Sequence, residues 1–131
     1  MSFLNNPDIA KLILRLGVGL LMLFHGVAKF IKGVDGIKGM LSYAGLPELM
    51  AYGVYIGEIV APILLVIGLK TRSAATLVIF TMLVAIYVAH PNDIFALNRV
   101  GAPVIELPLF YIFVSLAIIF LGAGKYSVDK S

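Results

Sequence analysis

The chain has 131 residues, of which 61% are hydrophobic and 13% are charged, and its formal net charge is +3. Soluble domains have about 45–50% apolar and about 25% charged residues, so this composition indicates an integral membrane protein with one domain, residues 1–131. The chain has no cysteine, which excludes thiol–disulfide relays, iron–sulfur clusters and thiolate metal sites on this chain alone. Its basic residues gather at the ends of apolar stretches, which argues against nucleic acid as a partner.

Four apolar stretches follow one another along the chain, each at or near the length of a membrane-crossing helix. A helix needs about 17–25 residues to cross the bilayer, and these stretches lack the apolar–polar alternation of barrel strands. We therefore expect an all-α, integral membrane, antiparallel four-helix bundle. The expected spans are residues 9–30, 49–69, 74–89 and 103–121.

The first span carries three ionisable residues on one half of the expected helix. At about 100° per residue, Arg15, His25 and Lys29 share one side of the helical wheel. This span is too long and too polar for a cleaved signal peptide. The three residues therefore indicate an inward-facing polar stripe, although Lys29 alone also fits a lysine that extends to the lipid headgroups.

The loop after the first span carries apolar residues at helical spacing. They are Ile37, Met40, Leu41 and Ala44. We expect a short amphipathic helix on the outer membrane surface, ended by Gly45 and Pro47. An ordinary packed connection is the alternative.

The second span contains Glu58, followed four residues later by Pro62. Proline has no amide hydrogen to bond the Glu58 carbonyl, so we expect a kink at this point that could accommodate a water or a ligand. Gly53, Gly57 and Ala61 recur every fourth residue of this span and permit close packing against a neighbouring helix.

Turn signals bound the last two spans. The segment 90–93 begins with His90-Pro91 and should end the third helix, and Pro103 suits the first turn of the fourth helix, which also contains Glu106. A short hinge, residues 68–72, joins the second and third spans on the side of both termini. The balance of Lys and Arg predicts that both termini lie in the cytoplasm, as in a multi-pass protein of the inner membrane.

The ionisable residues of the four spans are expected to converge inside the bundle. A charge in hydrocarbon costs about 3 kcal/mol or more, so such groups normally face one another. We expect an ion pair between Arg15 and Glu58, and a cluster nearer the outer surface. The expected cluster, which together with the pair would line a ligand pocket, is His25, Lys29, His90 and Glu106. A structural network that binds nothing is the alternative.

Metal binding has little support in the sequence. Di-iron bundles use Glu-x-x-His pairs, and the chain has none, so we expect no metal site. Ligation of a haem b iron by His25 and His90 is a weaker alternative, since two histidines make a weak signal.

Several motifs, in this order and spacing, are similar to those of one known family. They are Arg15 with His25-Gly26-x-x-Lys29; Glu58 followed by Leu64-Leu65-x-x-Gly68-Leu69-x-Thr71-Arg72; Glu106; and the tail Gly122-x-Gly124-x-x-Ser127-Val128-Asp129. Over essentially its whole length the chain resembles the DoxX family of small four-helix bacterial and archaeal membrane proteins. Its tail has Ser-Val-Asp where the family usually shows Ser-Leu-Asp.

The resemblance implies a membrane subunit tied to respiratory or redox chemistry. Family members are described as subunits of a terminal quinol oxidase, as relatives of thiosulfate:quinone oxidoreductase subunits, or as partners in oxidative-stress complexes. On this analogy the family's polar pocket is lined by Arg15, His25, Lys29, Glu58 and Glu106. The resemblance does not establish catalysis, because the chain has no recognisable flavin or nucleotide motif.

Quinone or quinol is the ligand that this pocket would suit. His25 or Lys29 could donate to one ring oxygen, and Glu58 or Glu106 could accept the protons of a quinol. Aromatic residues that could flank the ring are Phe24, Phe30 and Tyr55. The alternatives are a non-enzymatic scaffold, assembly or chaperone-like partner, and a transporter of small solutes or protons. The expected partners are the lipid bilayer and either another protein or a second copy of the chain.

Overall fold

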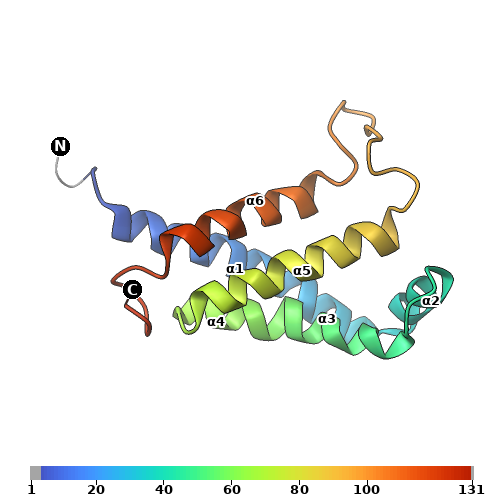
Figure 1. The fold of residues 1–131 in the computed structure, drawn as a ribbon, viewed down its shortest axis with the longest axis horizontal. Helices are drawn as coiled ribbons and strands as arrows, with labels where there is room; N and C mark the ends of the chain where they lie inside the picture. Colours follow the sequence, from blue (N-terminus) through green and yellow to red (C-terminus); the bar gives the residue numbers. More distant parts are fainter. Residues whose placement is uncertain (1–3, 131) are drawn as a thin grey trace.

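The structure, a computed structural model, describes residues 4–130 and is all-helical over that range, as the sequence predicts (Figure 1). Helix α1 spans Pro7–Lys32, α2 spans Asp35–Tyr43, α5 spans Thr71–Ala89 and α6 spans Glu106–Leu121. Between α2 and α5, one unbroken helical rod changes its winding along its length. Its parts are the 3₁₀-helix η1 (Glu48–Tyr52), α3 (Gly53–Tyr55), the π-helix η2 (Ile56–Val60) and α4 (Ala61–Ile67).

Three of these helical segments have the length and composition of membrane spans. They are Pro7–Lys32, Glu48–Ile67 and Thr71–Ala89, whereas the apolar helix Glu106–Leu121 is shorter. The expected place of Pro103 in the first turn of the last helix is wrong. Pro103 forms an isolated β-bridge with Leu97, and the helix begins only at Glu106. The amide of Val104 bonds the carbonyl of Ala96, so this stretch is paired with the preceding loop.

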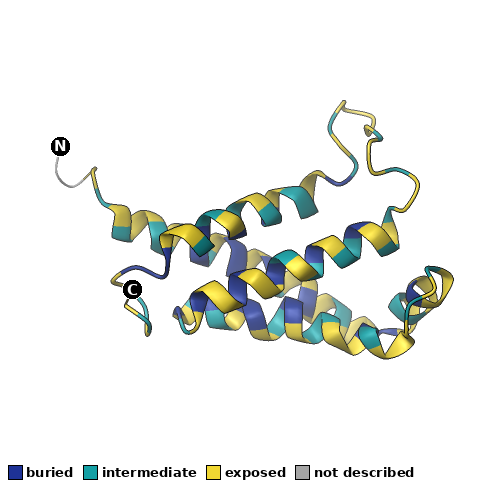
Figure 2. Ribbon diagram, in the orientation of Figure 1, coloured by how far each residue is buried: buried dark blue, intermediate teal, exposed yellow. Residues whose placement is uncertain are grey.

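The long helices pack side by side around one apolar core. Helix α1 contacts α4 and α6, α5 contacts the same two helices, and α2 packs on η1 and α5 at the end away from the termini (Figure 1). Buried faces point inward and exposed faces outward (Figure 2). Large apolar side chains, such as Phe24, Phe80, Phe110 and Phe120, are exposed on the outside. Soluble monomers rarely show apolar surface of this extent, which fits contact with lipid.

The amphipathic helix expected in the first loop is confirmed as α2. Its Leu41 is 2% exposed and packs in a small cluster with Val34 and Ala51. Through these contacts α2 is fixed against the start of the rod and against α5.

At Glu58, where the sequence predicts a kink, the rod winds as a π-helix. The amide of Ala61 bonds the carbonyl of Ile56, five residues earlier, and Pro62 has no amide hydrogen to offer the carbonyl of Glu58. Single π-turns inside α-helices occur frequently at functional sites. Here the π-turn contains the buried carboxylate of the second span.

Glycines let α1 approach this irregular stretch closely. A Cβ at Gly26 would overlap the backbone carbonyl of Glu58, and a Cβ at Gly19 would lie 2.9 Å from the carbonyl oxygen of Pro62. On the other side of the rod, a Cβ at Gly57 would overlap the hydroxyl of Thr81 on α5. Glu58 therefore lies between α1 and α5 because small residues leave room on both sides.

We expect Gly26→Ala to destabilise the protein by about 1–3 kcal/mol, the usual cost of overpacking, because its methyl group meets backbone that cannot move aside. Gly17→Ala on the same helix is the matched control, since no packing partner among residues 4–130 lies within 4 Å of its added Cβ. The control should stabilise α1 by about 0.5–1 kcal/mol through helix propensity. Thermal unfolding of the detergent-solubilised protein measures both changes, and equal melting temperatures would contradict this packing.

Candidate functional site

A buried ion pair links α1 to the π-helix. Lys29 Nζ lies 2.6 Å from Glu58 Oε2, and the Glu58 side chain is only 2% exposed. The expected ion pair between Arg15 and Glu58 is therefore wrong. Lys29 lies about four helical turns after Arg15 on α1, and it takes the place assigned to Arg15.

Arg15 instead binds backbone carbonyls at the opposite end of the molecule. Its guanidinium is fully buried and donates hydrogen bonds to the carbonyl oxygens of two segments. The acceptors are Leu65 at 2.9 Å and Val66 at 3.2 Å on α4, and Ala123 at 3.0 Å and Tyr126 in the C-terminal tail. Carbonyls at a helix C-terminus lack intrahelical partners, so the fork of Arg15 satisfies several at once. Arg15 thus joins the tail to the bundle.

Asp129 fixes the other side of the tail. Its carboxylate accepts hydrogen bonds from the amides of Lys70 at 3.0 Å and Thr71 at 2.9 Å, at the first turn of α5. The amide of Asp129 bonds the carbonyl of Gly68, whose positive φ of 73° ends α4. The tail motif that carries part of the family resemblance therefore closes the hinge between α4 and α5.

The hydrogen bond from the Thr71 amide has the largest effect and lowers the pKa of Asp129 below its usual value. Burial opposes this shift, and the weaker effect of the Lys70 amide lowers the pKa again. The charge of Arg15 lowers this pKa further.

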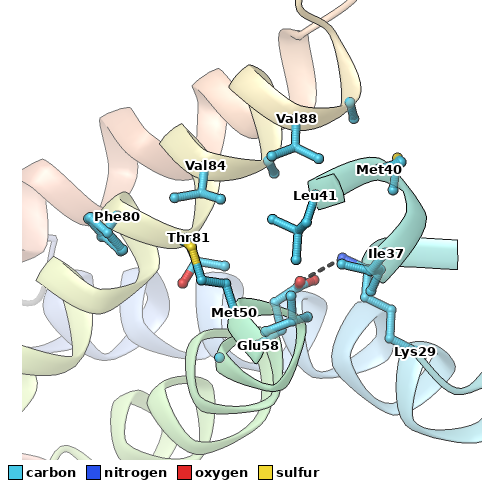
Figure 3. A pocket seen from close by; sticks show the side chains of 14 residues that line it. Lys29, Ile37, Met40, Leu41, Met50, Glu58, Phe80, Thr81, Val84 and Val88 are labelled. Atoms are coloured by element: carbon cyan, nitrogen blue, oxygen red, sulfur yellow. Dashed lines mark hydrogen bonds and ion pairs between the residues drawn. The ribbon is translucent and has the colours of Figure 1, made fainter. Parts of the chain in front are cut away.

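A cavity with a volume of about 310 Å³ lies beside the Lys29–Glu58 pair. Its wall is almost wholly apolar, and the pair lies at one side of it (Figure 3). Side chains of α2, of the rod and of α5 form the wall, including Leu41, Met50, Thr81, Val84 and Val88. Its size falls within the range of small-molecule sites, about 300–1,000 Å³.

A second, smaller cavity of about 110 Å³ borders the same ion pair. It is lined by His25 from α1 and by Tyr111 from α6, whose rings meet edge to face with centroids 6.1 Å apart. Lys29, Glu58 and Ala85 line both cavities. The ion pair therefore forms part of the boundary between an apolar space and a more polar one.

Of the six residues expected to form one pocket, the structure brings together His25, Lys29 and Glu58. His90 caps the end of α5 and pairs with Asp93 in the following loop, at 3.3 Å. Glu106 is exposed at the start of α6, and neither His90 nor Glu106 lines a cavity.

The aromatic residues expected around a ligand lie elsewhere too. Phe24 and Phe30 are exposed, and Tyr55 packs against Phe30 rather than lining either cavity. Haem ligation by His25 and His90 stays a prediction, although His90 does not line the cavity that His25 lines.

Two polar residues of the cavities, Thr81 and Tyr111, were not identified from the sequence. Thr81 is neutral and Tyr111 lies within an apolar stretch, so neither stands out as a charge in hydrocarbon would. For Thr81 the sequence offered one indication. Gly57, one of the small residues that recur every fourth position, indicates that a neighbouring helix comes close, and that helix presents Thr81. For Tyr111 the sequence offered no such indication, since the position of this residue depends on how α6 packs against α1.

Long apolar helices around a buried ion pair define a helical membrane protein. The DoxX family model matches residues 10–91, and a Haemophilus influenzae protein named "Uncharacterized protein" is 35% identical over 121 residues, 89% of this chain and 86% of that protein. A Bacillus subtilis protein named "Putative oxidoreductase CatD" is 34% identical over 79 residues, 60% of this chain and 58% of that protein. No solved structure matches with significant similarity. The chain belongs to the DoxX family.

A double-mutant cycle tests the Lys29–Glu58 pair. Lys29→Met leaves a carboxylate buried without its partner and should destabilise the protein by about 3 kcal/mol, at the low end for buried pairs because Lys29 is partly exposed. Glu58→Met added to Lys29→Met should restore much of this loss, since no buried charge remains. Chemical unfolding in detergent gives the free energies. If the loss in the double variant equals the sum of the losses in Lys29→Met and Glu58→Met, the two residues are not coupled as a pair.

The capping role of Asp129 predicts a pH-dependent contribution to stability. Because its folded pKa is lowered, this contribution is present above the usual aspartate pKa of about 3.9 and is lost as the pH falls through the folded value. The difference in melting temperature between wild type and Asp129→Asn should therefore be largest at neutral pH and shrink at acid pH. A difference that does not change with pH would argue against the carboxylate cap.

Proposed function

We propose that the chain is a four-helix bundle of the inner membrane, with both termini in the cytoplasm. Three helices have the length of spans, and the termini and the α4–α5 hinge lie at one end of the molecule (Figure 1). That end carries Lys70, Arg72, Lys125 and Lys130, against Lys32, Lys38 and Arg99 at the other. The positive-inside rule favours the richer end as cytoplasmic.

Within this frame, we propose that the larger cavity binds the head of a quinone or quinol, as part of a membrane subunit of a redox system. The observation that carries the proposal is the ion pair of the buried Glu58 with the partly exposed Lys29, at the side of an otherwise apolar cavity. The ammonium of Lys29 can donate to a quinone carbonyl oxygen, and the carboxylate of Glu58 can accept from a quinol hydroxyl. An apolar wall with few polar groups is typical of sites for such rings.

Two features of the cavity support a ligand that comes from the bilayer. Met40 of α2 and Phe80 of α5 line the cavity and are also exposed, so it opens on the side of the bundle between these helices. Thr81 donates its hydroxyl hydrogen to the carbonyl of Leu77 at 2.8 Å, which leaves its oxygen as an acceptor for a ligand hydroxyl. The relative whose name contains "oxidoreductase" agrees with a redox role.

A non-enzymatic scaffold is the second candidate, because the loop between α5 and α6 presents apolar side chains to the outside. Phe95 is 96% exposed and Val100 is 87% exposed. The side chain of Asn98 accepts hydrogen bonds from the amides of Val100 and Ala102, which holds this loop in a defined shape. Such a loop suits contact with another membrane subunit.

Substitution of Val84 by Phe tests the quinone proposal. Val84 lines the cavity and is not a member of the ion pair. A larger side chain there takes up space that the ligand needs, so quinone binding should fall at least about tenfold, or 1.4 kcal/mol. Leu83→Phe is the matched control, because Leu83 lies next to Val84, is 53% exposed and lines neither cavity. Quinone extracted from gently purified protein, followed by titration with a soluble ubiquinone or menaquinone analogue, measures binding. Wild-type protein that neither retains nor binds a quinone would favour the scaffold.

A further inference from the structure

The two cavities differ in what they can hold, although they share the Lys29–Glu58 pair. The larger one, of about 310 Å³, has an apolar wall and the size of an organic ring. The smaller one, of about 110 Å³, is too small for such a ring. The larger cavity therefore suits an organic ligand on one side of the ion pair, and the smaller cavity on its other side needs a different occupant.

Water is the occupant that suits the smaller cavity. A cavity volume of about 10–15 Å³ is enough for one water molecule, and each water needs two to four polar partners. The volume of about 110 Å³ is enough for several waters. Four of the lining side chains can bond them, namely His25, Lys29, Glu58 and Tyr111.

The smaller cavity also connects the buried carboxylate to the surface. Glu58 is 2% exposed, whereas His25 and Leu107 are exposed. Leu107 and Pro108 lie in the first turn of α6, directly after the loop from α5. The mouth therefore lies near the end of the bundle that carries the loops.

We propose that the smaller cavity is a water-filled proton pathway that links the Lys29–Glu58 pair to the loop end of the molecule, with His25 as the exchanging group at its mouth. A proton on the Glu58 carboxyl passes to a water, and this water gives a proton to the imidazole of His25. One proton moves, no carbon bond changes and no oxidant is consumed. Imidazole exchanges protons readily near neutral pH.

The titratable groups around the pathway come from three elements. Helix α1 supplies His25 and Lys29, the π-helix supplies Glu58, and α6 supplies Tyr111. The residues of α5 and α2 that line the two cavities are all uncharged.

The biological purpose of this pathway rests on the proposed function, the binding of a quinol in the larger cavity. A quinol in the larger cavity would release its protons to Glu58 on one side of the pair, and they would leave through the smaller cavity on the other. Organic ligand and proton would then use separate routes that meet only at the ion pair.

Time-resolved infrared spectroscopy on protein in lipid nanodiscs tests the pathway without any ligand. After rapid acidification, the infrared measurement follows the appearance of the carbonyl band of the protonated Glu58 carboxyl. This band is assigned to Glu58 by its absence in Glu58→Gln. His25→Leu should slow its appearance about a hundredfold, the low end of the contribution of a positioned proton-transfer group. Leu107→Phe, which narrows the mouth, should slow it as well. Phe24→Leu is the control on the same helix, because Phe24 is exposed and lines neither cavity, and its rate should match wild type.

A substitution in the larger cavity is the control that should affect quinone binding but not proton transfer. Val84→Phe should leave the rate of Glu58 protonation unchanged while it removes quinone binding. Wild-type rates in both His25→Leu and Leu107→Phe would overturn the pathway, as would equal slowing by Val84→Phe. If quinone does not bind but His25→Leu slows protonation, the proposed function fails and the pathway stands. If quinone binds and His25→Leu has no effect, the pathway alone fails.

Discussion

The carboxylate of Glu58 and its ion pair with Lys29 set the requirements that the surrounding structure meets. A charge buried among apolar helices is tolerated only with a partner and good geometry, and Lys29 supplies the partner at 2.6 Å. The contact requires α1 to come close to the rod, which is possible because Gly26 leaves room for the backbone carbonyl of Glu58. The same stretch is a π-helix, so the carboxylate lies where the regular winding is already interrupted.

The polar groups of the molecule divide into two separate systems. At the end of the termini, Arg15 and Asp129 bind backbone groups of α4, α5 and the tail. Arg15 donates four hydrogen bonds and the Asp129 carboxylate accepts two, which is typical of a structural role. At the other end, Lys29 and Glu58 border two cavities. A charged pair beside open space, rather than enclosed by its own partners, is the arrangement that suits binding or proton exchange.

This division changes how the motifs of the DoxX family are understood in this chain. Arg15 and the tail that ends in Asp129 hold the bundle together, whereas Lys29 and Glu58 form the candidate site. Residues that share a motif in the sequence therefore do not share a purpose. The distinction matters for mutagenesis, since loss of Arg15 disturbs the fold and loss of the pair disturbs the cavity.

The sequence by itself determined the helical class, the positions of the long apolar segments, the amphipathic α2 and the irregularity near Pro62. These features depend on local composition, on periodicity and on the missing amide of proline, all of which can be recognised in one stretch of chain. The sequence also identified the ionisable residues, because a charged residue within an apolar stretch can be recognised whichever way the helix is rotated. Only the tertiary structure decided their partners. Helix rotation and relative height are set by packing between distant segments, and this packing makes Lys29, about four turns after Arg15 on α1, the partner of Glu58. Thr81 and Tyr111 became part of the cavities for the same reason, since neutral residues acquire such a role only from the helices packed against them.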